Sequence, residues 1–353
     1  MTSTPRLSIL DATPISAGVP AEQALRWTTQ VAQAAEILGY HRLWVVEHHA
    51  MPTIGGSAPA VLIAHLAANT ATLRIGSGGV MLPNHPPLVI AEQFSTLHAL
   101  YPDRIDLGIG RANGAPPAAL KALRSDSEGH GMAAFAGQLD DLTGFLTDSL
   151  PAQHPWANVH ISPHTSPPPV YLLGSSTASA AFAGQRGMPF AFAHHLTKEL
   201  TREALDVYRA TFVPSQAVPE PYVMVTVGVV CAATDEHARH AATAATLYRL
   251  RAARARHDSR SIDAEELWDP TCSDNDRREA DEALAAGRFL VGDSVKVTNG
   301  LADLAKTTGA NELMLASIEF DGPARIRTLA SIATSWPWDK IGLELIHDHA
   351  KYD

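Results

Sequence analysis

The sequence predicts an α/β fold, a (β/α)8 TIM barrel with insertions at the C-terminal face of its strands. Two observations predict it: eight short β-rich runs occur along the chain, and a stretch with helical spacing follows each of them. Several runs are apolar throughout, which is typical of a parallel sheet covered on both faces. An open, doubly wound sheet is the alternative, because spacing alone does not show closure. The runs cover residues 7–10, 43–46, 73–75, 105–109, 170–173, 190–193, 222–230 and 313–317.

Helices are predicted between these runs, because apolar residues recur there every three or four positions. One helix ends before Gly39, where a glycine in the left-handed conformation is a common stop. Another begins at Pro87, since the first helical turn tolerates a missing N–H. The repeats that define these two helices are Trp27, Val31, Ala34 and Leu38, and Ile90, Phe94, Leu97 and Tyr101.

Three segments interrupt the rhythm. Residues 110–131 predict a long loop after the fourth strand, and residues 151–169 predict an irregular connection rich in proline. Residues 247–292 are dense in charge and form an insertion between the seventh and eighth units. We interpret this insertion as a solvated helix plus a mobile loop, placed where a barrel can carry a lid.

Composition limits the class of protein. A chain of 353 residues buries a sizeable core without disulfides or a structural metal, and it carries two cysteines, Cys231 and Cys272. Its formal net charge of −10 argues against a general nucleic-acid-binding protein. Residues 1–6 lack the layout of a secretory signal, and no apolar run reaches transmembrane length. We expect one cytoplasmic domain over residues 1–353, without nucleic-acid or membrane partners.

Candidate phosphate ligands follow the fourth and fifth strands, at the barrel face where active sites form. Ser175, Ser176 and Ser179 open a helix whose free amides suit a phosphate, although an ordinary serine N-cap is the commoner use of this pattern. The Arg111 guanidinium can complete such a site or pair with Asp106.

Other strand ends carry glycines and histidines. Ser77, Gly78 and Gly79 end the third strand, as a plain turn or as a place where a flat ligand approaches closely. After the second strand, Glu47 and His49 share one face while His48 lies on the other. A metallohydrolase would use such groups with Glu319 and Asp321, but no His-x-His spacing occurs in the first half of the chain, and we assign no metal site.

Taken together, three motifs resemble the bacterial-luciferase-like flavin monooxygenases. They are EILGYHRLWVVEHH at 36–49, RIGSGGVMLPNHPP at 74–87 with AEQ at 91–93, and PDRIDLGIGR at 102–111, followed by the Ser175-Ser176 turn. The resemblance runs from about residue 7 to beyond residue 315. Within the superfamily it is similar to the single-subunit branch that includes tailoring enzymes of actinomycete polyketide pathways.

This resemblance implies a barrel, often a homodimer, that receives reduced FMN (FMNH2) from a separate flavin reductase. The reduced flavin reacts with O2 to give a C4a-(hydro)peroxide that oxygenates the substrate. The helices at 59–71 and 88–101 are candidates for the dimer interface. Luciferase's light-emitting subunit has a reactive cysteine where this chain has Gly110, so we do not expect bioluminescence from a long-chain aldehyde.

By position, the resemblance also implies roles for single residues. His48 is the catalytic histidine that handles protons, and Glu47 orients it or a neighbouring backbone group. Ser77, Gly78 and Gly79 lie at the flavin, with a cis peptide between the two glycines. The phosphate ligands are Arg111, Ser175, Ser176 and Ser179, and His194 lies near the flavin edge.

The function predicted on this basis is FMNH2-dependent oxygenation of a small apolar substrate, aromatic or polyketide-like. Hydroxylation, epoxidation and Baeyer–Villiger insertion all stay open. The alternatives are hydride transfer with the deazaflavin F420 on the same fold, and a non-catalytic barrel that binds flavin. The substrate itself depends on loops whose sequence carries no readable code.

Overall fold

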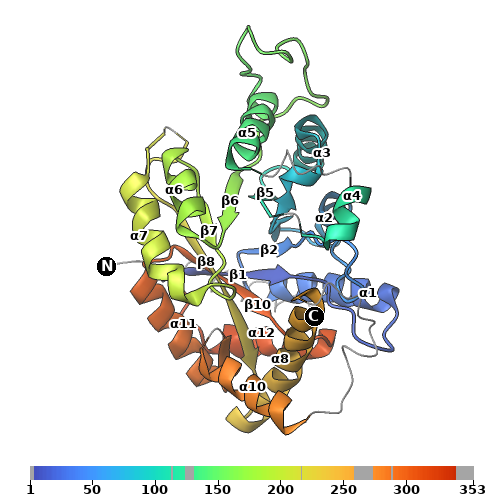
Figure 1. Ribbon diagram of the computed structural model, residues 1–353, viewed down its shortest axis with the longest axis vertical. Coiled ribbons are helices and arrows are strands. Elements are labelled where there is room, and N and C mark those ends of the chain that lie inside the picture. Colours follow the sequence, from blue (N-terminus) through green and yellow to red (C-terminus); the bar gives the residue numbers. More distant parts are fainter. Residues whose placement is uncertain are drawn as a thin grey trace, which may run out of the picture.

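The computed structural model describes residues 4–338 except 113, 124–130, 216, 258–272 and 288. Its strands form a closed parallel barrel, because the last barrel strand pairs with both the first and the seventh. The predicted barrel is therefore confirmed, and the open-sheet alternative is wrong (Figure 1). The eight barrel strands are β1 (Arg6–Asp11), β2 (Arg42–Val45), β3 (Arg74–Ser77), β5 (Ile105–Gly110), β6 (Val170–Gly174), β7 (Phe190–Phe192), β8 (Val223–Cys231) and β10 (Glu312–Ser317).

Helices cover the outside of the barrel and bury one face each against it. Gly39 has a φ of +79° after the first helix, and the third helix begins at Pro87, as the sequence predicts. The helices between consecutive barrel strands are α1 (Ala21–Ile37), α2 (Pro59–Ala68), α3 (Pro87–Leu100), α5 (Met132–Thr147), α6 (Thr177–Gln185), α7 (Thr201–Thr211) and α11 (Ser294–Thr308), with short 3-10 turns η1 (Leu82–Asn84) and η3 (Lys198–Leu200). The helix α12 (Gly322–Ser335) follows the last strand.

Two short strands were not predicted. The two-residue β4 (Val80–Met81) pairs with the end of β5, and the four-residue β9 (Phe289–Gly292) pairs with the end of β8. On β8, β7 pairs with Val223–Val225 and β9 with the residues from Gly228 to Cys231. Beyond the point where β7 stops, the sheet therefore continues along β8 toward the C-terminal end of that strand.

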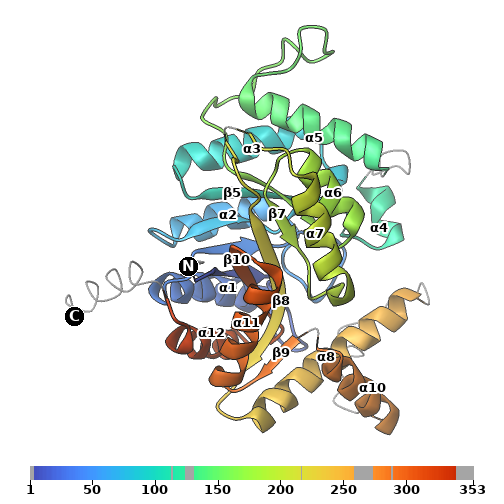
Figure 2. The ribbon, with the colours of Figure 1, turned by 90° about the vertical axis from the view of Figure 1, so that its left-hand side faces the viewer.

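The segment after β5, predicted as a long loop, includes the helix α4 (Pro117–Ala122), which corrects the sequence interpretation. The charged insertion at 247–292 was predicted as one helix and a loop; it holds the end of α8 (Asp235–His257), which begins before it, and in addition α10 (Asp274–Ala285) and β9. The part of that insertion at 258–272 lies outside the described residues. Figure 2 shows α8 and α10 projecting on the same side of the barrel as α4. Residues 151–169 carry no helix or strand, as predicted.

The barrel interior divides into an apolar middle and a charged lower end. Trp44, Tyr171, Ala191, Met224 and Met314 form the apolar cluster inside the barrel. Below it, at the N-terminal ends of the strands, the buried Arg42 guanidinium bonds to Asp106 at 2.7 Å and to Glu312 at 2.8 Å. This ion network closes the end of the barrel opposite the predicted site. Within the described residues, no helix has the length and apolar character needed to cross a membrane.

Candidate active site at the C-terminal ends of the strands

The predicted site residues lie at the C-terminal ends of consecutive strands, β2, β3, β5, β6 and β7. Backbone bonds tie neighbouring ends together: the Gly78 amide donates to the Val45 carbonyl at 2.8 Å, and the Ala193 amide donates to the Gly174 carbonyl at 2.9 Å. The Thr197 hydroxyl also donates to the Ser175 carbonyl at 2.7 Å. The barrel thus brings these segments to one face.

Glu47 is the centre of a hydrogen-bond network just beyond β2. Its buried carboxylate accepts bonds from the imidazoles of His49 at 2.7 Å and His85 at 2.8 Å, and from the Met81 amide at 3.0 Å. Burial alone would raise the pKa of Glu47, but the bonds from His85, His49 and Met81 outweigh it and hold that pKa below its usual value. The carboxylate therefore stays ionised and fixes two loops to β2.

The same three side chains form a possible metal-ligand group, since their ligand atoms all lie within 4.8 Å of one another. The two imidazole-to-carboxylate distances of 2.7 and 2.8 Å are hydrogen-bond lengths. Ligands of one tetrahedral zinc ion would lie roughly 3.4 Å apart. The arrangement is therefore that of a hydrogen-bonded triad.

His48 lies next to this network and is covered by the loop after β5. Its amide donates to the Gly56 carbonyl at 2.7 Å, and the next amide, that of His49, donates to the Gly114 carbonyl at 2.8 Å. Gly114 has a φ of +58°, and a Cβ there would lie 2.6 Å from the Glu47 carbonyl oxygen and 3.5 Å from His48 Nδ1. Only glycine fits at this position, so the loop packs directly onto the histidine pair.

A cis peptide joins Gly78 and Gly79, as the resemblance to the flavin enzymes implies. Both glycines press against the barrel wall: a Cβ on Gly78 would lie 2.5 Å from Leu10, and one on Gly79 would lie 2.8 Å from the Gly108 carbonyl oxygen. Neither position therefore accepts a side chain without displacing its neighbours. The Ser77 hydroxyl is buried and exchanges hydrogen bonds with the Gly108 carbonyl at 2.8 Å and amide at 3.0 Å, so it joins β3 to β5.

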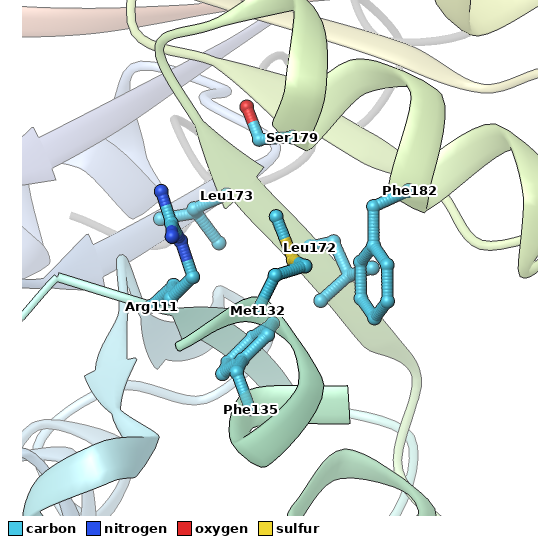
Figure 3. A pocket seen from close by; sticks show the side chains of 7 residues that line it. All are labelled: Arg111, Met132, Phe135, Leu172, Leu173, Ser179 and Phe182. Carbon is cyan, nitrogen blue, oxygen red and sulfur yellow. The ribbon is translucent and has the colours of Figure 1, made fainter. Parts of the chain in front are cut away.

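Arg111 and Ser179 line one small pocket that is partly open to solvent. Figure 3 shows both side chains beside Leu173, with Met132 and Phe182 on the other side of the pocket. The pocket thus places one cationic group and one hydroxyl together above an apolar floor.

The start of α6, which contributes Ser179 to this pocket, carries further hydrogen-bond donors. Ser176 and Ser179 form a capping box, in which the Ser176 hydroxyl accepts from the Ser179 amide at 3.2 Å. The amides of Thr177 and Ala178, in the first turn, have no acceptor inside the helix. The predicted N-cap use of these serines is therefore present, and it leaves first-turn donors for an anion.

Arg111 is exposed and, within the described part of the chain, forms no ion pair with a carboxylate. Pairing with Asp106 is not found, because that carboxylate is buried and bonds to Arg42 and Arg74. A free guanidinium beside a helix start is a donor set that fits a phosphate group. The site therefore suits a phosphate group or a similar anion.

The two histidines after β7 are not among the residues that line this pocket. His194 is buried with Nδ1 at 2.8 Å from the Thr201 hydroxyl, and burial, with the Lys198 charge, lowers its pKa to about 4. The His195 ring contacts the Thr226 carbonyl at 3.2 Å, and burial, with the nearby Arg249 guanidinium, lowers its pKa to about 4. Both imidazoles are neutral at neutral pH.

Sequence reasoning missed three contributors to this face: His85, Gly114 and Tyr248. The phenol of Tyr248, on α8, bonds to the Thr53 hydroxyl in the loop after β2. The sequence offered a signal for His85, which stands directly before two prolines. It offered none for Gly114 or Tyr248, because their contacts join segments far apart in the chain.

Comparison with known proteins gives consistent relatives. Residues 6–312 match the family model described as luciferase-like monooxygenase. A luciferase-like monooxygenase of Escherichia coli K12 is 40% identical over 330 residues, 91% of this chain and 94% of that protein. The N-acetyl-S-alkylcysteine monooxygenase of Bacillus subtilis is 42% identical over 212 residues, 59% of this chain and 63% of that protein. The solved structure of apo-MsnO8 has a TM-score of 0.81 at 36% identity, over 94% of this chain and 98% of that one.

Proposed function

Because the chain belongs to the luciferase-like monooxygenase family, we propose that it is a monooxygenase that uses reduced FMN and O2 to oxygenate a small organic substrate. The observation that supports a phosphate-bearing flavin cofactor is the pocket shared by Arg111 and Ser179. It supplies a guanidinium and a helix start for one phosphate, at the same barrel face as the Gly78–Gly79 cis peptide. The choice of FMN over F420 follows from the relatives named as monooxygenases.

In this proposal, the phosphate is held by Arg111, the first-turn amides of α6 and the serines Ser175, Ser176 and Ser179. The bare backbone of Gly78 and Gly79 supports the flavin ring, with Ser77 fixing that backbone to β5. When bound, reduced FMN supplies the electrons that activate O2. His194 is assigned to the flavin edge as a neutral group.

His48 is the proposed catalytic residue, and Glu47 is a positioning residue. The half-buried His48 is suited to hold and deliver a proton near neutral pH. Glu47 acts through the loops it fixes, since its carboxylate bonds to Met81, His49 and His85. The covering loop at Gly114 helps to exclude water from His48.

The proposed substrate is small and largely apolar, and the oxygenation is a hydroxylation, an epoxidation or a Baeyer–Villiger insertion. The relative named for N-acetyl-S-alkylcysteine adds compact thioethers to the substrates to be tested. We also propose that a separate flavin reductase supplies the reduced cofactor, and that the enzyme is a cytoplasmic homodimer.

Two measurements test this function. Anaerobic titration with reduced FMN and with F420 is expected to give tight binding of reduced FMN alone. Binding of F420 alone would instead support hydride transfer as the reaction of this enzyme. Turnover with NADH, a flavin reductase, FMN and a panel of aromatic ketides and thioethers is expected to yield a product with one added oxygen. Flavin binding without any such product would favour the non-catalytic barrel.

The role of His48 has its own test. The His48→Gln variant is expected to bind FMN as the unmodified enzyme does and to lose most of its oxygenation rate. An unchanged rate with intact FMN binding would show that His48 is not the proton-handling residue.

A further inference from the structure

One face of α8 covers the mouth of the barrel. Its residues Ala238, Ala242 and Ala245 are buried and pack with Val230 of β8 and Ile318 just after β10. Their spacing of four and three residues defines a single helix face. The next position on that face, four residues after Ala245, is Arg249.

The Arg249 side chain is directed to the barrel interior by its stacking partner. Its guanidinium carbon lies 4.8 Å from the ring centroid of Phe289, at the start of β9. That ring in turn lies on Gly228 of β8, where a Cβ would be 2.2 Å from it. Gly228 is on the same side of β8 as Met224, which belongs to the cluster inside the barrel. The stack of Arg249 on Phe289 therefore sits over the barrel mouth.

The Arg249 charge has no anion to balance it in the part of the chain that the structure describes. The buried arginines Arg42 and Arg325 each bond to a carboxylate, whereas Arg249 is half-buried against an aromatic ring without one. Burial lowers the pKa of Arg249, and its neighbour His195 is an uncharged imidazole. Removing a cation from water without a counter-charge is costly, so an anionic ligand would be favoured there.

This cation lies on a different part of the mouth from the proposed phosphate site. Arg111 and Ser179 follow β5 and β6, whereas Arg249 lies beside Phe289 at the start of β9, which pairs with Gly228 of β8. The two guanidinium groups can therefore serve two different anionic groups.

We propose that Arg249 binds the carboxylate of the substrate, so that the enzyme acts on a compact carboxylic acid whose apolar part extends into the barrel mouth. This inference rests on the proposed monooxygenase function and names its substrate class. A guanidinium binds a carboxylate with paired, charge-assisted hydrogen bonds, and stacking on Phe289 fixes its plane for that contact. A phosphate could use the same donors, so the experiment includes an arm for the cofactor.

The test compares carboxylic acids with their uncharged primary amides: hexanoate with hexanamide, and 4-phenylbutyrate with 4-phenylbutyramide. Dissociation constants are measured by calorimetry on the full chain, with and without saturating FMN. We expect the unmodified protein to prefer the acid by about tenfold or more. Arg249→Gln should remove that preference, and Arg249→Lys should keep part of it. Arg239→Gln, the same change at an exposed position on α8, should leave the preference intact.

Each contrary outcome has a separate meaning. The proposal is wrong if the unmodified protein does not prefer the acids, or if both Arg249 variants keep its full preference. If Arg249→Gln weakens the binding of FMN but not of riboflavin, the guanidinium serves the cofactor phosphate instead. Failure of the unmodified protein to bind FMN at all would count against the proposed function, while the measurements without FMN would still decide the role of Arg249.

Discussion

The Nε2 atom of His85 lies 2.8 Å from the Oε1 atom of Glu47, although 38 residues separate them in the chain. The Met81 amide binds the other carboxylate oxygen, so Glu47 connects the end of β2 to the whole turn that follows β4. Replacing the carboxylate by an amide puts an N–H₂ group against one of these donors. We expect Glu47→Gln to lower the free energy of unfolding by about 1–3 kcal/mol and to reduce the oxygenation rate about tenfold or more.

The pH dependence separates this positioning role from simple destabilisation. The pKa of Glu47 is lowered in the folded protein, so its contribution to stability is complete above the unfolded value of 4.5 and is lost as the pH falls through the folded value. Urea unfolding between pH 3 and 6 should show a smaller loss of stability in Glu47→Gln than in the unmodified protein, in which this contribution adds to those of other groups. Glu203→Gln, at an exposed position on α7, is the matched control. An unchanged rate and an unchanged pH slope in Glu47→Gln would contradict the role.

The role of Arg111 can be tested by comparing its effect on the binding of FMN and of riboflavin. Riboflavin lacks the phosphate of FMN, so a guanidinium that binds the phosphate affects FMN alone. We expect Arg111→Gln to weaken FMN binding by about 10-fold to 100-fold and to leave riboflavin binding unchanged, as measured by fluorescence titration. Arg202→Gln, on the exposed face of α7, should change neither. Equally weakened binding of FMN and riboflavin would show that Arg111 contacts the flavin ring or stabilises the fold instead.

The barrel was predictable because each of its strands is an apolar run whose length and flanking turns are local properties of the sequence. All eight predicted runs coincide with barrel strands. The strand β4 escaped prediction because two residues give no period, and β9 because it lies in the charged segment 247–292, which by composition reads as a helix and a loop. β9 pairs with the part of β8 that extends beyond β7. Residues 247–257 look solvated by composition, but the buried alanines of α8 lie earlier, at 238, 242 and 245, and cover the barrel mouth.

The candidate site was predictable to the extent that strand ends converge in any parallel barrel. That rule places Arg111 and Ser179 together, and the structure gives them one pocket. It does not say which way a side chain turns once the strand has ended. Ser77 thus faces β5, and His194 faces Thr201 at the start of α7. These orientations depend on packing between elements distant in sequence.

The lower end of the barrel gives a stability prediction that is independent of function. Arg42 is 2% exposed and bonds to Asp106, Glu312 and the Tyr171 hydroxyl. Removing the guanidinium leaves the buried Glu312 carboxylate without its counter-charge and Asp106 with Arg74 alone, so we expect Arg42→Met to cost about 3–5 kcal/mol of unfolding free energy. Arg42→Lys keeps the charge and should cost less.

Urea unfolding measures both variants, and FMN titration of the folded protein provides the control. The network lies at the opposite end of the strands from Arg111, so FMN affinity should stay unchanged in folded Arg42→Lys. A loss below about 1 kcal/mol in Arg42→Met would show that the two carboxylates take up protons or water at little cost.

His194 predicts a specific acid sensitivity. Burial, with the nearby Lys198 charge, lowers its pKa from 6.5 to about 4, so the unfolded chain binds a proton at a pH where the folded protein does not. The contribution of His194 to the free energy of unfolding is therefore complete above pH 6.5 and is lost as the pH drops toward 4. The loss from this one group is about 2 kcal/mol between pH 7.5 and 5. His194→Gln removes this titration while keeping a polar partner for Thr201. Its stability should consequently fall less over the same pH range, whereas His237→Gln, at an exposed position, should follow the unmodified protein.

Because the His194 imidazole is already neutral from pH 6 to 8, a change in oxygenation rate within that range must come from another group. If His194→Gln abolishes such a change, the ring is protonated in the working enzyme and its assignment as a neutral group at the flavin edge is wrong.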